Sequence, residues 1–432
     1  MTRSRLDGGR GVRLAITAVA LLGLLALGAG DARSGNRAQI TLTALIYVAG
    51  QPSAEAVIEN FERANPNIAI NVTYTPTVAS LYQLETIELA AGNAPDILST
   101  YPGCGTPISI CELAKAGDLA PMIGKTWAKS LDPRVLSYSK LGPTLFMYEP
   151  SAVFDGLLTN DTLFKKLGLK IPKTFSQLLG FCQKARAAGT IPLLLTAEGS
   201  NTLQQLIADI ALTTVYANDK QWGKALRAGT VTFDGTPGWH QALQEIVDMN
   251  NDQCFQQGPA ATTGPAGDAL FAQGQTVTYA MNTSHKGAID ASDPQFAYSQ
   301  SPFPTANDPS KTVVELHFPT GFSVNAHSSA QNRLAAQAFI DFIARPDQDG
   351  LFAHIAGGLS ESQLRSGQFP AFLSGFLPLY RDGRYQINPI ETWWNASVGN
   401  ALTTYATGLL TGQESIDDVL RAMDAAWKLG PN

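Results

Sequence analysis

The spacing of apolar residues alternates between two periods in the segment that begins near residue 40. Ile40–Val48 is an apolar run rich in β-branched residues, which predicts a buried strand, and Ile68–Tyr74 predicts a second one. Between them, apolar side chains recur at helical spacing after Ser53, and the helix is expected to end before Pro66. This region therefore begins as strand, helix and strand.

The same alternation continues through the next thirty residues. A helix is expected over residues 80–91, ended by Gly92, and the apolar residues from Ile97 onward predict a third strand. The order strand-helix-strand-helix-strand is typical of open, mostly parallel sheets with helices on both faces. We therefore predict an α/β fold.

Helical and strand patterns start again in the second half of the chain. Helices are predicted over residues 174–188, 201–217, 237–250, 331–343, 402–410 and 415–428, and strands over 191–196 and 274–281. A chain of 432 residues is too long for one ordinary core, so we expect two domains or lobes.

The first thirty residues have a different character. Four arginines precede the apolar run Leu14–Ala29, which is shorter than the roughly twenty residues of a membrane helix. Small residues follow, so we predict a secretory signal peptide over residues 1–30, with a permanent N-terminal anchor as the alternative. Gly30 stands where a lipoprotein would carry its lipidated cysteine. We therefore expect an exported protein, periplasmic or extracellular, without a lipid anchor.

The four cysteines all follow this segment. An even number of cysteines in an oxidising compartment suggests disulfides, and four cysteines allow three pairings. We predict a bond between Cys104 and Cys111, which would close a short loop, and a second between Cys182 and Cys254. Buried free thiols are the alternative, and neither pair has the spacing of metal ligands.

Charge and motif content narrow the function classes. The net charge of −6 and the absence of a basic cluster argue against a nucleic-acid partner. The sequence has no G-x-S-x-G, H-E-x-x-H, P-loop or strand-linked G-x-G-x-x-G motif, and its five histidines lack metal-ligand spacing. We therefore expect neither catalysis nor a cofactor. A glycosidase needs only two suitably separated carboxylates, so this class stays open.

Several short segments resemble one protein family in its own order along the chain. They include IENFERANPNI at 58–68, AAGNAPDI at 90–97, LAKAGDLAP at 113–121, FAQGQ at 271–275 and GQESI at 412–416. Residues 163–175 and 321–324 match further landmarks. Together these segments resemble the family 1 extracellular solute-binding proteins, the maltose-binding-protein-like receptors of ABC importers.

The resemblance implies a fold and an activity. Family members have two α/β lobes that close on a ligand like a hinge, which would place lobe 1 at residues 38–147 and 284–345 and lobe 2 at 148–283 and 346–432. It also implies capture of a sugar or oligosaccharide outside the membrane and delivery to the transmembrane permease subunits. We expect a monomer that is not an enzyme.

Candidate ligand contacts follow from the ends of the predicted strands. In open α/β sheets the ligand lies beyond the carboxyl ends of the strands. Sugars combine apolar faces with a rim of hydroxyl groups, so aromatic, amide, carboxylate and imidazole side chains suit them. In the loops at the carboxyl ends of the predicted strands, we predict ligand contacts from Tyr47, Gln51, Thr100, Tyr101, Glu198, Asn201, Asn282 and His285.

The resemblance adds four further candidates. Glu149 and Asp155 lie near the expected first crossing between lobes, where family members often offer a carboxylate to a sugar hydroxyl. Trp393 and Trp394 lie where the family often brings a stacking aromatic from the C-terminal lobe, with core packing as the alternative. The other tryptophans, Trp127, Trp222, Trp239 and Trp427, are interpreted as packing or surface residues.

Two alternatives to a sugar receptor stay open, and one residue, Asp96, is expected to be structural. The solute could instead be a glycerophosphodiester, which would need arginines or helix N-termini, or a polyamine, which would need an acidic cleft. A secreted glycoside-active enzyme is the alternative outside the receptor class. Asp96, between a proline and a buried strand, is predicted to hold its turn through backbone N–H groups and not to act in catalysis.

Overall fold

The computed structural model describes residues 39–319 and 321–430, so the predicted signal peptide lies outside the described residues. The predicted N-terminal alternation is present as β1 (Ile40–Tyr47), α1 (Gln51–Ala64), β2 (Ile68–Thr75), α2 (Val78–Ala91) and β3 (Ile97–Thr100). Thr77 caps α2 through the backbone N–H of Ser80, and Gly92 ends it with a φ of 72°. No described helix is long and apolar enough to cross a membrane.

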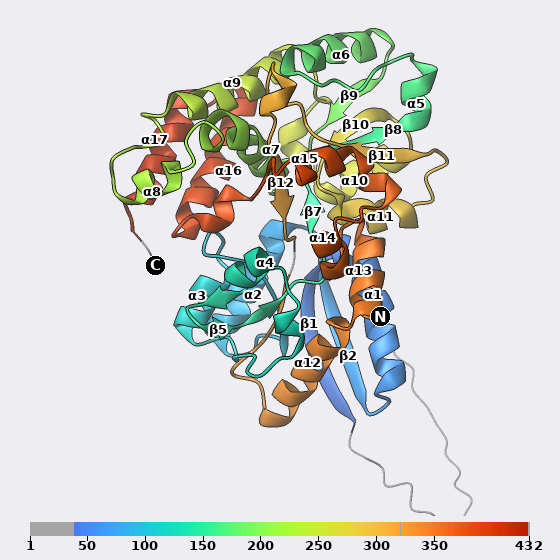
Figure 1. The fold of residues 1–432 in the computed structure, drawn as a ribbon, viewed down its shortest axis with the longest axis vertical. Helices are drawn as coiled ribbons and strands as arrows, with labels where there is room; N and C mark the ends of the chain where they lie inside the picture. The colour runs from blue at the N-terminus through green and yellow to red at the C-terminus, as the bar shows by residue number, and fades with distance from the viewer. Residues whose placement is uncertain (1–38, 320, 431–432) are drawn as a thin grey trace, which may run out of the picture. The chain divides into compact units, whose positions relative to one another are not determined.

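The first sheet has the strand order β2-β1-β3-β13-β6, in which β13 is Gly321–Val324 and β6 is Met147–Tyr148. The first three strands are parallel, whereas β13 runs antiparallel to both of its neighbours. α1, α12 (Ala330–Ile343) and α13 (Pro346–Ala356) lie beside this sheet in Figure 1. Their apolar side chains share one buried core with the strands.

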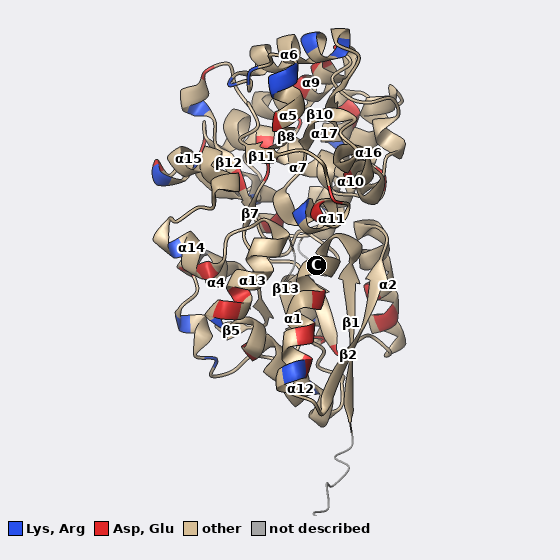
Figure 2. Cartoon of the chain, turned by 90° about the vertical axis from the view of Figure 1, so that its right-hand side faces the viewer, with Lys and Arg blue, Asp and Glu red and all other residues tan. Residues whose placement is uncertain are grey.

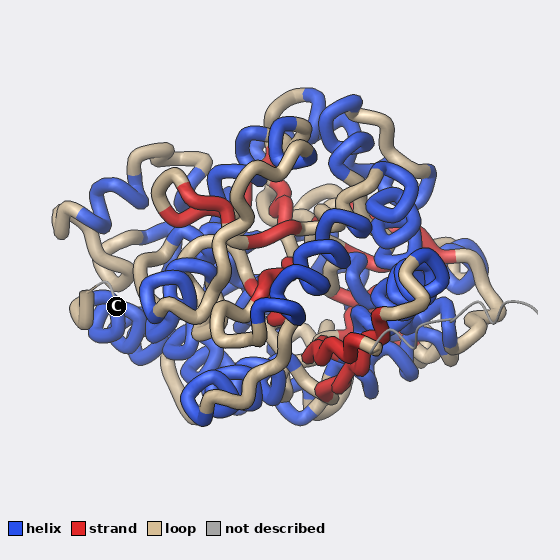
Figure 3. The backbone as a smooth tube through the Cα atoms, turned by 90° about the horizontal axis from the view of Figure 1, so that it is seen from below, coloured by secondary structure: helices blue, strands red, loops and turns tan. Residues whose placement is uncertain are grey.

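The second sheet has the order β11-β8-β10-β9. Its strands are β8 (Leu157–Asn160), β9 (Ile191–Leu194), β10 (Thr276–Ala280) and β11 (Tyr298–Ser301). Only β10 and β9 are parallel, so the predicted parallel order holds for part of each sheet. The helices that share its core include α6 (Phe175–Ala187), α7 (Thr202–Ala211), α9 (Pro237–Asn251), α16 (Ala396–Thr411) and α17 (Ile416–Trp427). Figure 3 shows helices on both sides of the strands.

A third, small sheet connects these regions. It consists of β14 (Tyr385–Ile387), β12 (Val314–His317) and β7 (Val153–Phe154), and β4 (Lys140–Leu141) pairs with β5 (Thr144–Leu145) elsewhere. The remaining α-helices are α3 (Ile110–Ala116), α4 (Pro133–Tyr138), α5 (Asp161–Lys166), α8 (Trp222–Arg227), α10 (Gly264–Ala272), α11 (Lys286–Ala291), α14 (Glu361–Ser366) and α15 (Leu377–Arg381). β7 follows β6, and β12 precedes β13, so this sheet adjoins two passages of the chain from one large sheet to the other.

Two contacts differ from the expected division of the chain. β11 lies within residues 284–345, expected in lobe 1, yet it pairs with β8 of the second sheet. α13 lies within residues 346–432, expected in lobe 2, yet its Phe352 belongs to the core of the first sheet. The strand pairing therefore favours boundaries between β12 and β13 and after α13, because the chain returns to the first sheet only at Gly321.

Asp96 connects the start of β3 to two neighbouring elements. Its carboxylate accepts hydrogen bonds from the backbone N–H and the hydroxyl of Thr43, at 3.0 and 3.2 Å, and from the amide of Asn332 in α12 at 3.1 Å. Its own N–H donates to the Thr43 hydroxyl at 3.1 Å. The residue is thus a structural anchor, but it holds β1 and α12 to β3, whereas the sequence predicted that it would fix its own turn.

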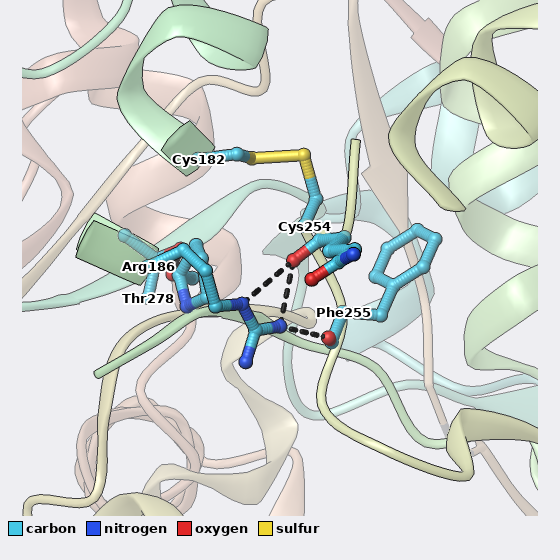
Figure 4. Close-up of a disulfide and its surroundings, with 7 residues drawn as sticks. Cys182, Arg186, Cys254, Phe255 and Thr278 are labelled. Atoms are coloured by element: carbon cyan, nitrogen blue, oxygen red, sulfur yellow. Dashed lines mark hydrogen bonds between the residues drawn. A yellow bond between two sulfur atoms is a disulfide. The ribbon is translucent and has the colours of Figure 1, made fainter. Parts of the chain in front are cut away.

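The structure contains the two disulfides Cys104–Cys111 and Cys182–Cys254. The second joins α6 to the segment after α9 (Figure 4). Arg186, one helical turn after Cys182, donates to the carbonyl oxygens of Gln253 and Phe255 on the same segment. The disulfide and the hydrogen bonds of the Arg186 guanidinium therefore both hold this segment to α6.

Candidate functional site

A cavity lies where the carboxyl ends of strands from both large sheets meet. Its lining combines side chains near the ends of β1 and β3 with others from the start of α7 and from the segment after β10. This is the position that the general rule for open α/β sheets gives for a ligand. The cavity measures about 60 Å³, whereas ligand pockets usually measure roughly 300–1,000 Å³. The cavity is therefore smaller than a usual ligand pocket.

The two sides of the cavity differ in chemistry. We call the side built on the first sheet the apolar wall; it includes Ile46, Tyr47, Val78, Tyr101, Phe322 and Phe352. We call the opposite side the polar wall; it includes Asn201, Thr202, Gln205, Asn282, His285 and His317. Figure 2 shows that residues of both charge signs are scattered along the chain, yet none of the described lining residues is Lys, Arg, Asp or Glu.

Tyr101 reaches the cavity in contact with Tyr82 of α2. The two rings meet edge to face, 5.5 Å apart, and the hydroxyl of Tyr82 accepts a hydrogen bond from the Asn201 amide at 2.8 Å. Burial raises the pKa of Tyr101 above its ordinary value, so its phenol stays neutral. Asn201 belongs to the polar wall, and this contact therefore connects the two walls at one edge of the cavity.

Tyr47 and His285 meet at another edge. Their rings are 5.7 Å apart, and Nδ1 of His285 lies 2.8 Å from a carboxylate oxygen of the buried Asp268. A Cβ atom at Gly264 would lie only 2.4 Å from the Tyr47 hydroxyl. Glycine at this position therefore allows α10 to approach the tyrosine closely.

Three polar side chains form a hydrogen-bonded chain along the polar wall. The amide of Asn282 donates to Gln205 Oε1 at 3.3 Å, and the amide nitrogen of Gln205 lies 3.2 Å from Nε2 of His317. The backbone N–H of Ser284 donates to Asn282 Oδ1 at 3.0 Å. Asn282, Gln205 and His317 are each at most 8% exposed, so their only open side is the cavity.

Buried acidic residues lie one layer behind His317. Its Nδ1 is 3.2 Å from Glu391 Oε1 and 3.8 Å from Glu315 Oε1. Burial raises the pKa of both carboxyl groups well above the ordinary value, and the nearby Asp155 raises both further. Burial also lowers the pKa of His317, although Asp155 opposes this effect. The site thus favours neutral forms of all these groups.

Seven of the predicted contacts do not line this cavity. Glu149 and Asp155 are buried behind it, and burial raises the pKa of both. Gln51 is the first residue of α1 and donates to Glu55 at 2.8 Å. Thr100 is fully buried beside Ser323. Glu198 is exposed to solvent. Trp393 lies in the core of the second sheet, and Trp394 stacks on Trp427.

The structure therefore brings five predicted residues together at the cavity. They are Tyr47, Tyr101, Asn201, Asn282 and His285. Gln205 and His317 also line the cavity and were not predicted from the sequence. Gln205 lies one helical turn after Asn201, a spacing that could have identified it, whereas His317 ends a short apolar strand and gave no signal.

One surface cluster has the distances of a metal site. Among the described residues, only the side chains of Asp234, His240 and Asp417 bring three ligand atoms within 4.8 Å of one another. Both aspartates are exposed, and none of the three lines the cavity.

A family model and a curated protein with a similar sequence both point to solute-binding proteins. A family model described as bacterial extracellular solute-binding protein matches residues 48–350. A multiple sugar-binding protein of Streptococcus mutans is 27% identical over 147 residues, and this match spans about a third (34%) of each chain.

Solved structures agree with the fold. A solute-binding protein of Thermotoga lettingae, bound to α-D-tagatose, has a TM-score of 0.75 at 15% identity, covering 90% of this chain and 99% of its own. A sugar transporter protein of Bacillus licheniformis in complex with stachyose has a TM-score of 0.72 at 19% identity, covering 90% and 100%. A maltose-bound protein of T. maritima gives 0.73 at 16% identity, with 90% and 99% coverage. At these identities the similarity shows the fold.

Proposed function

Because the chain belongs to the bacterial extracellular solute-binding proteins, we propose that it captures a sugar or oligosaccharide reversibly and delivers it to the transmembrane subunits of an ABC importer. The observation that carries this proposal is the composition of the cavity: an apolar wall with two tyrosines faces a wall of amides and imidazoles. A sugar has apolar C–H faces and a rim of hydroxyl groups, so the two walls match its two kinds of surface.

The uncharged lining also weighs against the other solutes. A glycerophosphodiester would need a cationic partner, and a polyamine would need carboxylates in the lining, but no described lining residue is charged. A glycosidase would need a pair of carboxyl groups on either side of the scissile bond. Relatives whose structures carry stachyose, maltose and tagatose make a carbohydrate the first class to test.

Ligand capture would proceed by movement of the two large sheets. In this proposal the cavity of about 60 Å³ belongs to a closed form, and opening would occur about the small sheet that contains β7 and β12. Contacts made by both walls to one ligand favour closure, because only the closed form satisfies them together. The proposal includes export by the signal peptide at residues 1–30, no lipid anchor, no catalysis, no nucleic-acid partner and a monomeric state.

A panel of mono- to tetrasaccharides tests the proposal. We expect at least one of maltose, raffinose and stachyose to raise the melting temperature without being converted. Spermidine and glycerophosphocholine serve as the charged controls and should give no shift. Release of a cleaved product would contradict the receptor assignment, and a shift only with a charged control would contradict the carbohydrate.

A further inference from the structure

The orientation of the Gln205 amide is fixed by its neighbours. The backbone N–H of Ser284 can only donate, so the Asn282 atom 3.0 Å from it must be the oxygen. The NH2 group of Asn282 then faces Gln205, so the Gln205 atom 3.3 Å away must be its oxygen. This leaves the Gln205 nitrogen facing Nε2 of His317 at 3.2 Å.

The orientation of the Gln205 amide also determines which nitrogen of His317 carries the proton. Because an N–H of Gln205 points at Nε2, this nitrogen must be an acceptor, and the neutral imidazole carries its proton on Nδ1. Nδ1 lies 3.2 Å from Glu391 Oε1, but neither atom has a hydrogen-bond partner among the described residues. A doubly protonated His317 would place a second donor against Gln205, and flipping the Gln205 amide would only move the conflict to Asn282. Burial lowers the pKa of His317 and acts in the same direction.

We propose that Gln205 is a specificity-determining residue that presents an N–H donor to the cavity and therefore selects a ligand oxygen, such as a hydroxyl or a ring oxygen, against an ammonium group. One of its two amide hydrogens faces His317, and the second is available to a ligand, since Gln205 lines the cavity. His317 and Asn282 are positioning residues that keep this donor in place. The inference rests on the proposed carbohydrate function and names the group that the ligand offers at this point.

The titratable groups around His317 define its pH dependence. They are Glu315 on its own strand, Glu391 before α16 and Asp155 after β7, while Gln205 faces it from α7. Acidification far enough to protonate His317 would break its contact with Gln205 and weaken ligand binding. Affinity should therefore fall at acidic pH through the titration of His317.

The tautomer can be measured without a ligand. Long-range 1H–15N correlation spectra of the full protein should show His317 as the neutral form with its proton on Nδ1 at pH 7, and the assignment can be made by the loss of this signal in His317→Gln. An Nε2–H tautomer or an imidazolium at pH 7 would overturn the fixed orientation. In Gln205→Glu the residue facing Nε2 becomes an acceptor, so the pKa of His317 should rise.

Binding of maltose, raffinose and stachyose, measured by calorimetry, tests the selection. Gln205→Glu should weaken the sugar that binds by roughly 5- to 150-fold, as expected for an unmet buried polar group. Gln204→Glu is the matched control, because Gln204 is equally buried on the same helix but donates to the carbonyl of Gly399 away from the cavity. It should lower stability and leave affinity within about twofold.

The outcomes separate the two proposals. If the wild type binds one of these sugars and Gln205→Glu binds it equally well, the inference fails while the carbohydrate function stands. If the wild type binds none of the three, the proposed function fails and the ligand selection fails with it. The NMR measurement then still decides whether the amide orientation is right.

Discussion

The two walls of the cavity reach the same ligand space by different means. The apolar wall is made by residues at strand ends and on helices that also belong to the first core, so its shape follows from packing. The polar wall is made by side chains whose orientations depend on one another, from Ser284 through Asn282 and Gln205 to His317. Loss of one apolar side chain removes contact area, whereas loss of one polar side chain leaves its partners without hydrogen bonds.

This difference predicts that substitutions in the polar wall reduce affinity most. Asn282→Ala removes the donor to Gln205 and the acceptor of the Ser284 N–H together. We expect a loss of sugar affinity toward the upper end of roughly 5- to 150-fold, measured by calorimetry. Ser200 also lines the cavity, but its hydroxyl pairs with Thr202 and not with the chain of amides. Ser200→Ala is therefore the control and should stay within about fivefold. Equal losses for the two variants would refute the cooperative polar wall.

A smaller loss is expected from the apolar wall. Tyr101→Ala removes an aromatic ring that contacts Tyr82 and lines the cavity. Burying a large apolar side chain contributes about 1.5–3 kcal/mol in total, and only part of this ring faces the ligand, so a loss of about tenfold is expected. Tyr101→Phe should retain most of the affinity. If Tyr101→Phe loses as much as Tyr101→Ala, the hydroxyl and not the ring is responsible.

The layer behind the polar wall should affect stability with pH more than affinity. Burial raises the pKa of Glu391, so its carboxyl holds a proton in the folded protein and loses it at its ordinary pKa when unfolded. Folding stability from this group is therefore full at low pH and falls as pH rises above about 4.5. Glu391→Gln should gain stability relative to wild type between pH 5 and 7.5, measured by urea unfolding. A constant difference across this range would show that Glu391 is ionised when folded.

The smallest effect on affinity is expected at Asp96. Asp96→Ala leaves the Thr43 N–H without its acceptor inside the first sheet. The free energy of unfolding should fall by about 1–3 kcal/mol, while sugar affinity per folded molecule stays unchanged. Asp96→Asn, which keeps one carbonyl oxygen, should recover part of the stability. Lost binding at unchanged stability would contradict the structural role.

The fold could be predicted where a segment has both a clear apolar period and a residue that marks its end. The segment from β1 to β3 has strong apolar periods, and glycine stops such as Gly92 mark helix ends. No helix was predicted between residues 343 and 402, although α13 begins at Pro346 and proline suits the first turn of a helix. The antiparallel pairing of β13 with β3 depends on residues about 220 positions apart, which no local period reports.

The site was predictable only as far as strand ends locate it. Tyr47 ends β1 and Asn282 follows β10, and the rule for open sheets finds both residues. Trp393 looks the same as a stacking residue in sequence, but Phe233 and Trp239 surround it in the second core. Gln205 and His317 derive their importance from each other, and this pairing across 112 positions exists only in the folded chain.

The small size of the cavity also has a kinetic consequence. Under the proposed closure, a ligand held between the two walls cannot leave until the walls separate, so the opening rate sets an upper limit on its dissociation rate. Different ligands should then share the same fastest possible release, and affinity differences at that limit would reside in capture. Residence time would become a property of the protein, which a permease could shorten by holding the two sheets apart.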